Sequence, residues 1–196
     1  MKLNSRELTR AGLFTALHIA AAVILRFGGE AAVPFSLVPL FVILAGTLLG
    51  PQGAWSLVLY AVMGFLGLPV FAQPPYGGIS YLLLPSAGYI FGYILAAWFI
   101  GWVSNRLAKL TVTRLFLVSV GGLVLLYACG LPYLYGVFRW VVGKQLELQQ
   151  VLTFGLYPFI GFDLAKALVA SMLTIVIRKR LPSLQTKEPA SGRAGF

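Results

Sequence analysis

The sequence predicts an all-α protein, a polytopic membrane bundle of six transmembrane helices. Hydrophobic residues make up 59% of its 196 residues and charged residues only 10%, and the mean hydropathy is +0.89. The apolar runs are long and continuous, whereas the strands of an outer-membrane barrel alternate. The length accommodates about six spans of roughly 20 residues each, joined by short loops.

The apolar runs predict helices at 8–27, 35–50, 53–68, 86–108, 113–141 and 153–180. Glycine and proline mark the joints, at Gly28-Gly29, at Gly50-Pro51 and from Pro69 to Pro85. In the fifth run, Gly121-Gly122 and Pro132 predict a kink or a break. Residues 1–181 then form one transmembrane domain, and residues 182–196 form a polar, disordered tail.

The cations lie at the ends of the apolar runs, which is typical of membrane topology and not of a nucleic-acid surface. With both termini on one side of the membrane, that side holds eleven cations: Lys2, Arg6, Arg10, Arg106, Lys109, Arg114, Arg178, Lys179, Arg180, Lys187 and Arg193. The other side holds Arg26, Arg139 and Lys144. The positive-inside rule then places both termini in the cytoplasm. Treating the first run as a signal peptide leaves five spans and fits these charges less well.

The only aspartate of the chain, Asp163, lies inside the last apolar run, three residues before Lys166. This spacing puts both side chains on one face of a helix. A charge at bilayer depth is costly and usually faces a cavity, a partner or a substrate. The pair therefore predicts a site for a small polar ligand. The alternative is a buried ion pair that only fixes helix packing.

Two further segments are candidates for assembly and for covering a site. Gly12, Ala16 and Ala20 form a stripe of small residues that lets another helix approach closely, either a partner's helix or one of the same bundle. The uncharged segment 69–81 can act as a lid over a cavity, or can rest on the bilayer interface.

Motifs for catalysis, metal binding and ATP hydrolysis are missing from the sequence. His18 has no second histidine or nearby carboxylate, so we expect an interior hydrogen-bonded residue and no metal site. Cys129 is the only cysteine and is expected to pack as a small residue. Without a phosphate-binding loop, the chain is not expected to hydrolyse ATP by itself. We expect no enzyme activity and no cofactor.

Several segments together resemble the biotin-specific substrate-binding (S) components of energy-coupling factor (ECF) transporters, the BioY family. They are Val33-Pro34-Phe35-Ser36-Leu37, Leu44-Ala45-Gly46-Thr47-Leu48-Leu49-Gly50-Pro51, Gly64-Phe65-Leu66-Gly67-Leu68-Pro69-Val70-Phe71, Gly88-Tyr89-Ile90-Phe91-Gly92-Tyr93 and Asp163-Leu164-Ala165-Lys166. The resemblance implies six helices in the cytoplasmic membrane of a prokaryotic cell. It also implies a deep extracytoplasmic pocket for biotin, capped by the loops between helices one and two and between helices three and four.

The resemblance also implies partners and site residues. The partners are a transmembrane coupling (T) protein and two cytoplasmic ATPases, and the stripe Gly12, Ala16 and Ala20 matches the small-residue motif that docks on the coupling protein. Asp163 suits a ureido N–H of biotin, and Lys166 suits a carboxylate or carbonyl oxygen. The other candidate ligand-binding residues are Tyr89, Tyr81, Gly77, Gly78 and Ser36, with Phe91 in the apolar wall.

Two positions depart from the family pattern. Val38 stands where members often have glutamine, and Leu84-Pro85-Ser86 stands where they often have Gly-Pro-Thr. These departures keep a component for another small vitamin open as an alternative. An intramembrane enzyme acting on lipid, or a channel or scaffold, are more distant alternatives, because His18, Asp163 and Lys166 are the few polar residues at depth.

Overall fold

The computed structural model describes residues 5–27 and 36–180. Within these ranges the chain is helical and contains no β-strand, which confirms the predicted all-α class. The α-helices are α1 (Ser5–Phe27), α2 (Val38–Leu49), α3 (Ala54–Phe65), α4 (Ala87–Ser104), α5 (Val112–Trp140), α6 (Leu148–Gly155) and α7 (Tyr157–Arg180). Two 3₁₀-helices, η2 (Gly50–Gly53) and η3 (Ile79–Leu83), precede α3 and α4. The predicted tail and the loop between the first two helices lie outside the described residues.

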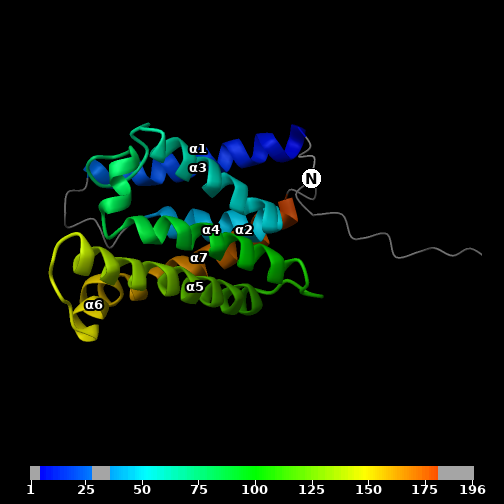
Figure 1. Ribbon diagram of the computed structural model, residues 1–196. Coiled ribbons are helices and arrows are strands. Elements are labelled where there is room, and N and C mark those ends of the chain that lie inside the picture. Colours follow the sequence, from blue (N-terminus) through cyan, green and yellow to red (C-terminus); the bar gives the residue numbers. More distant parts are fainter. Residues whose placement is uncertain (1–4, 28–35, 181–196) are drawn as a thin grey trace, which may run out of the picture.

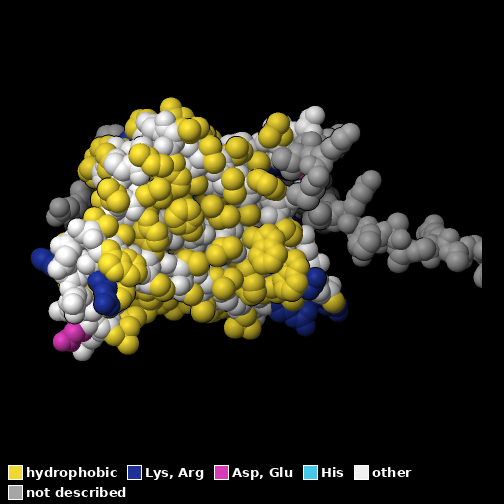
Figure 2. Space-filling model, viewed as in Figure 1, with side chains coloured by type: hydrophobic (Ala, Val, Ile, Leu, Met, Phe, Trp, Pro, Cys, Tyr) yellow, Lys and Arg dark blue, Asp and Glu magenta, His cyan; other side chains and the backbone are white. Residues whose placement is uncertain are grey.

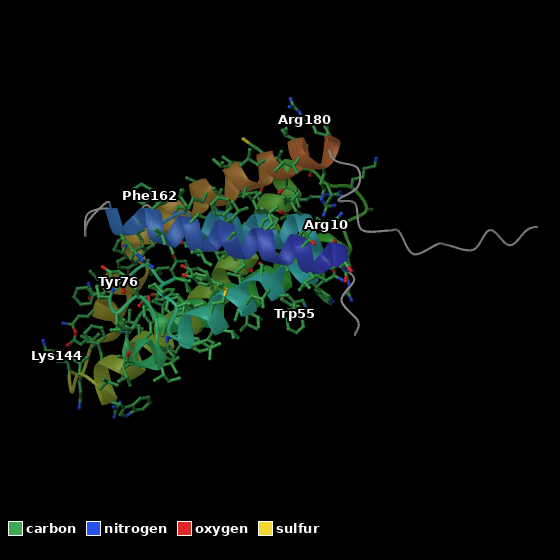
Figure 3. The ribbon with its side chains drawn as sticks, turned by 90° about the horizontal axis from the view of Figure 1, so that it is seen from above. Arg10, Trp55, Tyr76, Lys144, Phe162 and Arg180 are labelled. Carbon is green, nitrogen blue, oxygen red and sulfur yellow. The ribbon has the colours of Figure 1, made fainter. Side chains whose placement is uncertain are left out.

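The helices that run along the long axis of the molecule are α1, α2, α3, α4, α5 and α7 (Figure 1). Arg10 and Arg180 lie at one end, which we call the terminal end, and Tyr76 and Lys144 lie at the other, the loop end (Figure 3). Six passages therefore return the described chain to the end where it starts. This arrangement agrees with an even number of spans.

The joint predicted at Gly50-Pro51 is the turn η2, which reverses the chain between α2 and α3 (Figure 1). By length and composition, five described stretches can cross a membrane, and Val38–Phe65 is one of them. The structure divides this stretch into two helices of 12 residues. Each is about 18 Å long, well short of the roughly 30 Å hydrocarbon core. The hairpin needs a glycine at residue 53, because a Cβ there would come within 2.3 Å of the Ala45 carbonyl oxygen.

Apart from shifts of a few residues at the helix ends, the structure differs from the predicted helices in α5 and in the last helix. α5 continues through Gly121, Gly122 and Pro132, so the predicted break is not present. The predicted last helix is two helices, because α6 ends at Gly155 and α7 begins at Tyr157. A capping box between Glu147 and Gln150 starts α6. Proline is tolerated in the first turn of a helix, where its missing N–H costs nothing, and Pro158 occupies that turn of α7.

Helix α4 is central to the packing, since it contacts α2, α3 and α5. Gly92 allows α4 to approach α5 closely: a Cβ there would lie 2.7 Å from the Leu126 carbonyl oxygen of α5. On the outside, apolar side chains cover the middle of the visible face, and dark blue cations lie at its two ends (Figure 2). This distribution is that of a bundle surrounded by lipid.

Candidate ligand-binding site

A cavity of about 150 Å³ is lined by residues of α1, α2, α3, α4, α5 and α7, by Ser36 just before α2, and by residues between α3 and α4. Most of its wall is apolar, but polar groups converge on it from different helices. They are the phenols of Tyr60, Tyr81, Tyr89, Tyr93 and Tyr127, the side chains of Ser36, Gln73 and Ser86, and the charged Asp163 and Lys166. An apolar pocket with a few convergent polar groups is the usual form of a small-molecule site.

Asp163 and Lys166 form an ion pair in the wall of this cavity. Lys166 Nζ donates to Asp163 Oδ1 at 2.8 Å, and Tyr127 Oη of α5 donates to Oδ2 at 2.6 Å. Asp163 is only 3% exposed. Both carboxylate oxygens therefore have a partner, and each still has a lone pair for a ligand N–H.

The charged pair lies inside the bundle near the loop end. Asp163 is six residues after the start of α7, which corresponds to about 9 Å along the helix. Its neighbour Phe162 lies in the half of the molecule that contains Tyr76 (Figure 3). A ligand at Asp163 would therefore approach from the loop end.

Tyrosines from α4 and α5 hold the cavity wall in place next to this pair. The rings of Tyr89 and Tyr127 meet edge to face, with centroids 6.2 Å apart. Tyr89 Oη also donates to the Gly155 carbonyl oxygen at 2.8 Å, which ties α4 to the end of α6. The Tyr127 phenol connects α5 to Asp163 of α7. The charged pair is thus fixed from three helices before any ligand binds.

A second aromatic group forms the wall toward the loop end. The Phe71 ring packs against Tyr81 and Tyr60, with centroid separations of 4.3 and 5.4 Å. The Ser86 hydroxyl donates to Tyr81 Oη at 3.3 Å. Burial raises the pKa of the Tyr81 phenol above its usual value, so this group stays protonated and can donate a hydrogen bond at neutral pH.

The structure brings together five of the seven proposed ligand-binding residues: Asp163, Lys166, Tyr89, Tyr81 and Ser36 all line the cavity. Gly77 and Gly78 do not. A Cβ on Gly77 would lie 2.2 Å from the Leu68 carbonyl oxygen, and the Gly78 N–H donates to the Gly64 carbonyl at 2.7 Å. Both glycines therefore lie against the backbone of Leu68 and Gly64 and not against the cavity. Phe91 also lies outside the cavity wall, where it stacks on Phe65.

Sequence reasoning missed several residues of the cavity wall, mainly Tyr60, Tyr93, Tyr127 and Phe159. A signal was present for one of them. Tyr89 and Tyr93 are four residues apart, so they share a helix face, and a Tyr hydroxyl inside an apolar span usually has a buried partner.

The sequence model of the BioY family matches residues 1–183. The chain belongs to the BioY family. It is 35% identical to the "Biotin transporter BioY" of Thermotoga maritima, over 89% of this chain and 96% of the relative. It is 32% identical to the "Probable biotin transporter BioY" of Pyrococcus horikoshii, over 91% and 98% of the two chains. The resemblance seen in the sequence is thereby confirmed.

The fold is also that of a solved structure, the 2.1 Å crystal structure of the S-component for biotin from an ECF-type ABC transporter. The TM-score is 0.70 at 23% identity, and the match covers 91% of this chain and 95% of the other. The relatives are named as transporters, and five described stretches are long and apolar enough to span a membrane. This BioY-family chain is therefore a multi-pass membrane protein.

The stripe on α1 faces outward in this BioY-family chain. Gly12, Ala16 and Ala20 are all exposed, and a Cβ on Gly12 would have nothing within 4 Å. Among the described residues, the stripe therefore does not serve close packing within the bundle. His18, on the opposite side of α1, is fully buried, and its Nδ1 lies 2.5 Å from the Phe14 carbonyl oxygen.

Proposed function

We propose that this chain is the substrate-binding component of a biotin uptake system, and that the cavity beside Asp163 is its biotin site. Membership of the BioY family and relatives named as biotin transporters support this function. The observation that carries the site is the ion pair itself. The only aspartate of the sequence is buried, is held by Lys166 and Tyr127, and lines the cavity.

The chemistry of the cavity matches the three parts of biotin. A ureido ring needs acceptors for its two N–H groups and donors for its carbonyl, which the Asp163 carboxylate and the tyrosine phenols supply. The apolar thiophane ring fits against aromatic walls such as Tyr60, Tyr89 and Phe159. The carboxylate tail needs a cation or hydroxyl donors, and Lys166, Ser36 and Ser86 line the same cavity.

Equilibrium binding of labelled biotin to the detergent-purified chain tests this function. We expect saturable binding that unlabelled biotin displaces and that thiamine or riboflavin does not. Val38, where family members often have glutamine, lies in the cavity wall, so these competitors also test the alternative of another vitamin. Saturable binding of one of them with no biotin binding would replace biotin as the ligand.

We further propose that the chain works with a transmembrane coupling protein and two cytoplasmic ATPases. The solved structure with this fold is an S-component of an ECF-type ABC transporter, and the exposed small-residue stripe of α1 provides a surface for another helix. The coupling protein would bind this face of α1, and ATP hydrolysis in the partners would drive transport.

The terminal end is proposed to face the cytoplasm, with both termini, because it carries most of the cations. This orientation predicts the labelling of single cysteines in a Cys129→Ala background. Lys109→Cys, exposed in the loop between α4 and α5, should react with an impermeant thiol reagent only from the cytoplasm. Lys144→Cys, exposed at the loop end, should react only from outside. The opposite pair of results would invert the orientation.

A further inference from the structure

Arg26, in the last turn of α1, binds the loop of residues 66–78 that follows α3. Its Nε and Nη2 both donate to the Phe71 carbonyl oxygen, at 3.1 and 2.8 Å, and Nη2 also donates to the Pro69 carbonyl oxygen. The guanidinium carbon lies 4.4 Å from the centroid of the Tyr76 ring. One side chain of α1 therefore holds three residues of this loop.

Phe71 connects these contacts to the cavity. Its ring is fully buried and packs beside Gly64, where a Cβ would come within 2.0 Å of it. The same ring contacts Tyr60 and Tyr81, which line the cavity. The next two residues of the loop, Ala72 and Gln73, line it as well. Phe71 thus connects the loop to two other parts of the molecule. Its carbonyl accepts from Arg26 of α1, and its ring packs against the aromatic side chains of the cavity wall.

We propose that Arg26 is a positioning residue that fixes the loop of residues 66–78 against the cavity and thereby slows release of the ligand. Arg26 does not itself line the cavity, so it acts through Phe71, Ala72 and Gln73. The identity of the ligand rests on the proposed function. The position of the loop depends on Arg26 whatever the ligand is.

The geometry requires arginine. A guanidinium carries several donors in one rigid plane, so it can bind two carbonyl oxygens and stack on a ring at the same time. A lysine ammonium is a point charge on a flexible stem and cannot do all three. A cation that only set membrane topology would need none of these contacts. Arg139, also at the loop end, is such a case: it is exposed, and its Nη1 donates to Tyr135 Oη one turn earlier on its own helix.

The test compares Arg26→Gln and Arg26→Lys with the matched control Arg139→Gln in purified chain. Arg26→Gln should speed dissociation of labelled biotin by about tenfold, the equivalent of 1.4 kcal/mol, the order of one hydrogen bond to a charged group. Arg26→Lys should give an intermediate rate, because lysine keeps the positive charge but lacks the planar set of donors. Arg139→Gln should dissociate like the parent. Equal rates for Arg26→Gln and Arg139→Gln would overturn the proposal.

A second measurement does not depend on the ligand. In a Cys129→Ala background, a cysteine introduced by Gln73→Cys should react with a thiol reagent several times faster when Arg26→Gln is added, with no biotin present. Adding Arg139→Gln should leave the rate unchanged. If the parent binds no biotin while the Arg26 effect on reactivity is present, the proposed function fails and the role of Arg26 in the loop stands. An unchanged reactivity overturns that role.

Discussion

Asp163→Asn and Lys166→Met should each weaken biotin binding by at least about tenfold, or 1.4 kcal/mol. Each change leaves the other member of a buried pair without its countercharge, at a cost of several kcal/mol. Asp163→Asn also replaces a carboxylate that accepts hydrogen bonds from Tyr127 and Lys166. Tyr127→Phe removes only the hydrogen bond to Oδ2, so its effect should be smaller. Titration calorimetry on folded, monodisperse variants measures these changes.

The double variant Asp163→Asn with Lys166→Met separates a ligand site from a structural ion pair. It leaves no uncompensated charge, so the fold should regain the stability that either single change loses. Biotin binding should stay weak if the pair contacts the ligand. Recovery of full affinity in the double variant would assign the pair to helix packing alone.

Thr174→Val is the matched control for these variants. Thr174 lies on the same helix, is fully buried and bonds to Thr47 of α2 at 2.7 Å. It is eleven residues from Asp163, about 16 Å along α7, and does not line the cavity. Its loss should lower thermal stability and leave the biotin affinity unchanged.

Gly12→Trp or Ala16→Trp should weaken association with the coupling protein by at least about tenfold, or 1.4 kcal/mol. A bulky ring on this stripe prevents the close approach of another helix. The isolated chain should fold and bind biotin normally, because both residues are exposed and a Cβ on Gly12 meets nothing within 4 Å. Co-purification of the complex and biotin uptake by cells measure the loss.

Leu117→Trp provides the control for a large apolar side chain on the outside of the bundle. Leu117 is 63% exposed on α5, away from the stripe, so its replacement should leave association unchanged. If the α1 variants lose biotin binding while their association with the coupling protein is intact, the stripe serves packing within the bundle and not the interface.

The charged pair was visible in the sequence, whereas most of the cavity wall was not. A charge in an apolar helix is expensive, so Asp163 and Lys166 stand out without any structure. Tyr60, Tyr93 and Tyr127 do not stand out, because a tyrosine in an apolar helix can pack, face lipid headgroups or line a cavity at little cost. Which of these it does depends on the rotation of its helix against its neighbours.

The contacts of the loop of residues 66–78 were also not predictable from the sequence. The lack of charge in segment 69–81 predicted either a lid over a cavity or a loop resting on the bilayer interface, and Ala72 and Gln73 line the cavity. The sequence assigned the close backbone contact to Gly77 and Gly78. In the structure the path of the loop depends on Phe71, which enters the bundle beside Gly64, and on Arg26 from α1. Contacts between residues distant in sequence leave no periodic pattern, so only the fold reveals them.

The helical class, the six passages and the pairing of Asp163 with Lys166 on one helix face were predictable from the sequence alone. Each depends on a local property: the length of an apolar run, the spacing of two residues on one helix, or the cost of a charge in lipid. Only the folded structure shows that α2 and α3 form a hairpin, that the stripe of α1 faces outward, that Tyr127 donates to Asp163 and that Arg26 donates to the loop of residues 66–78. These features depend on how helices pack against one another, because a side chain's role is set by the neighbours that the fold brings to it.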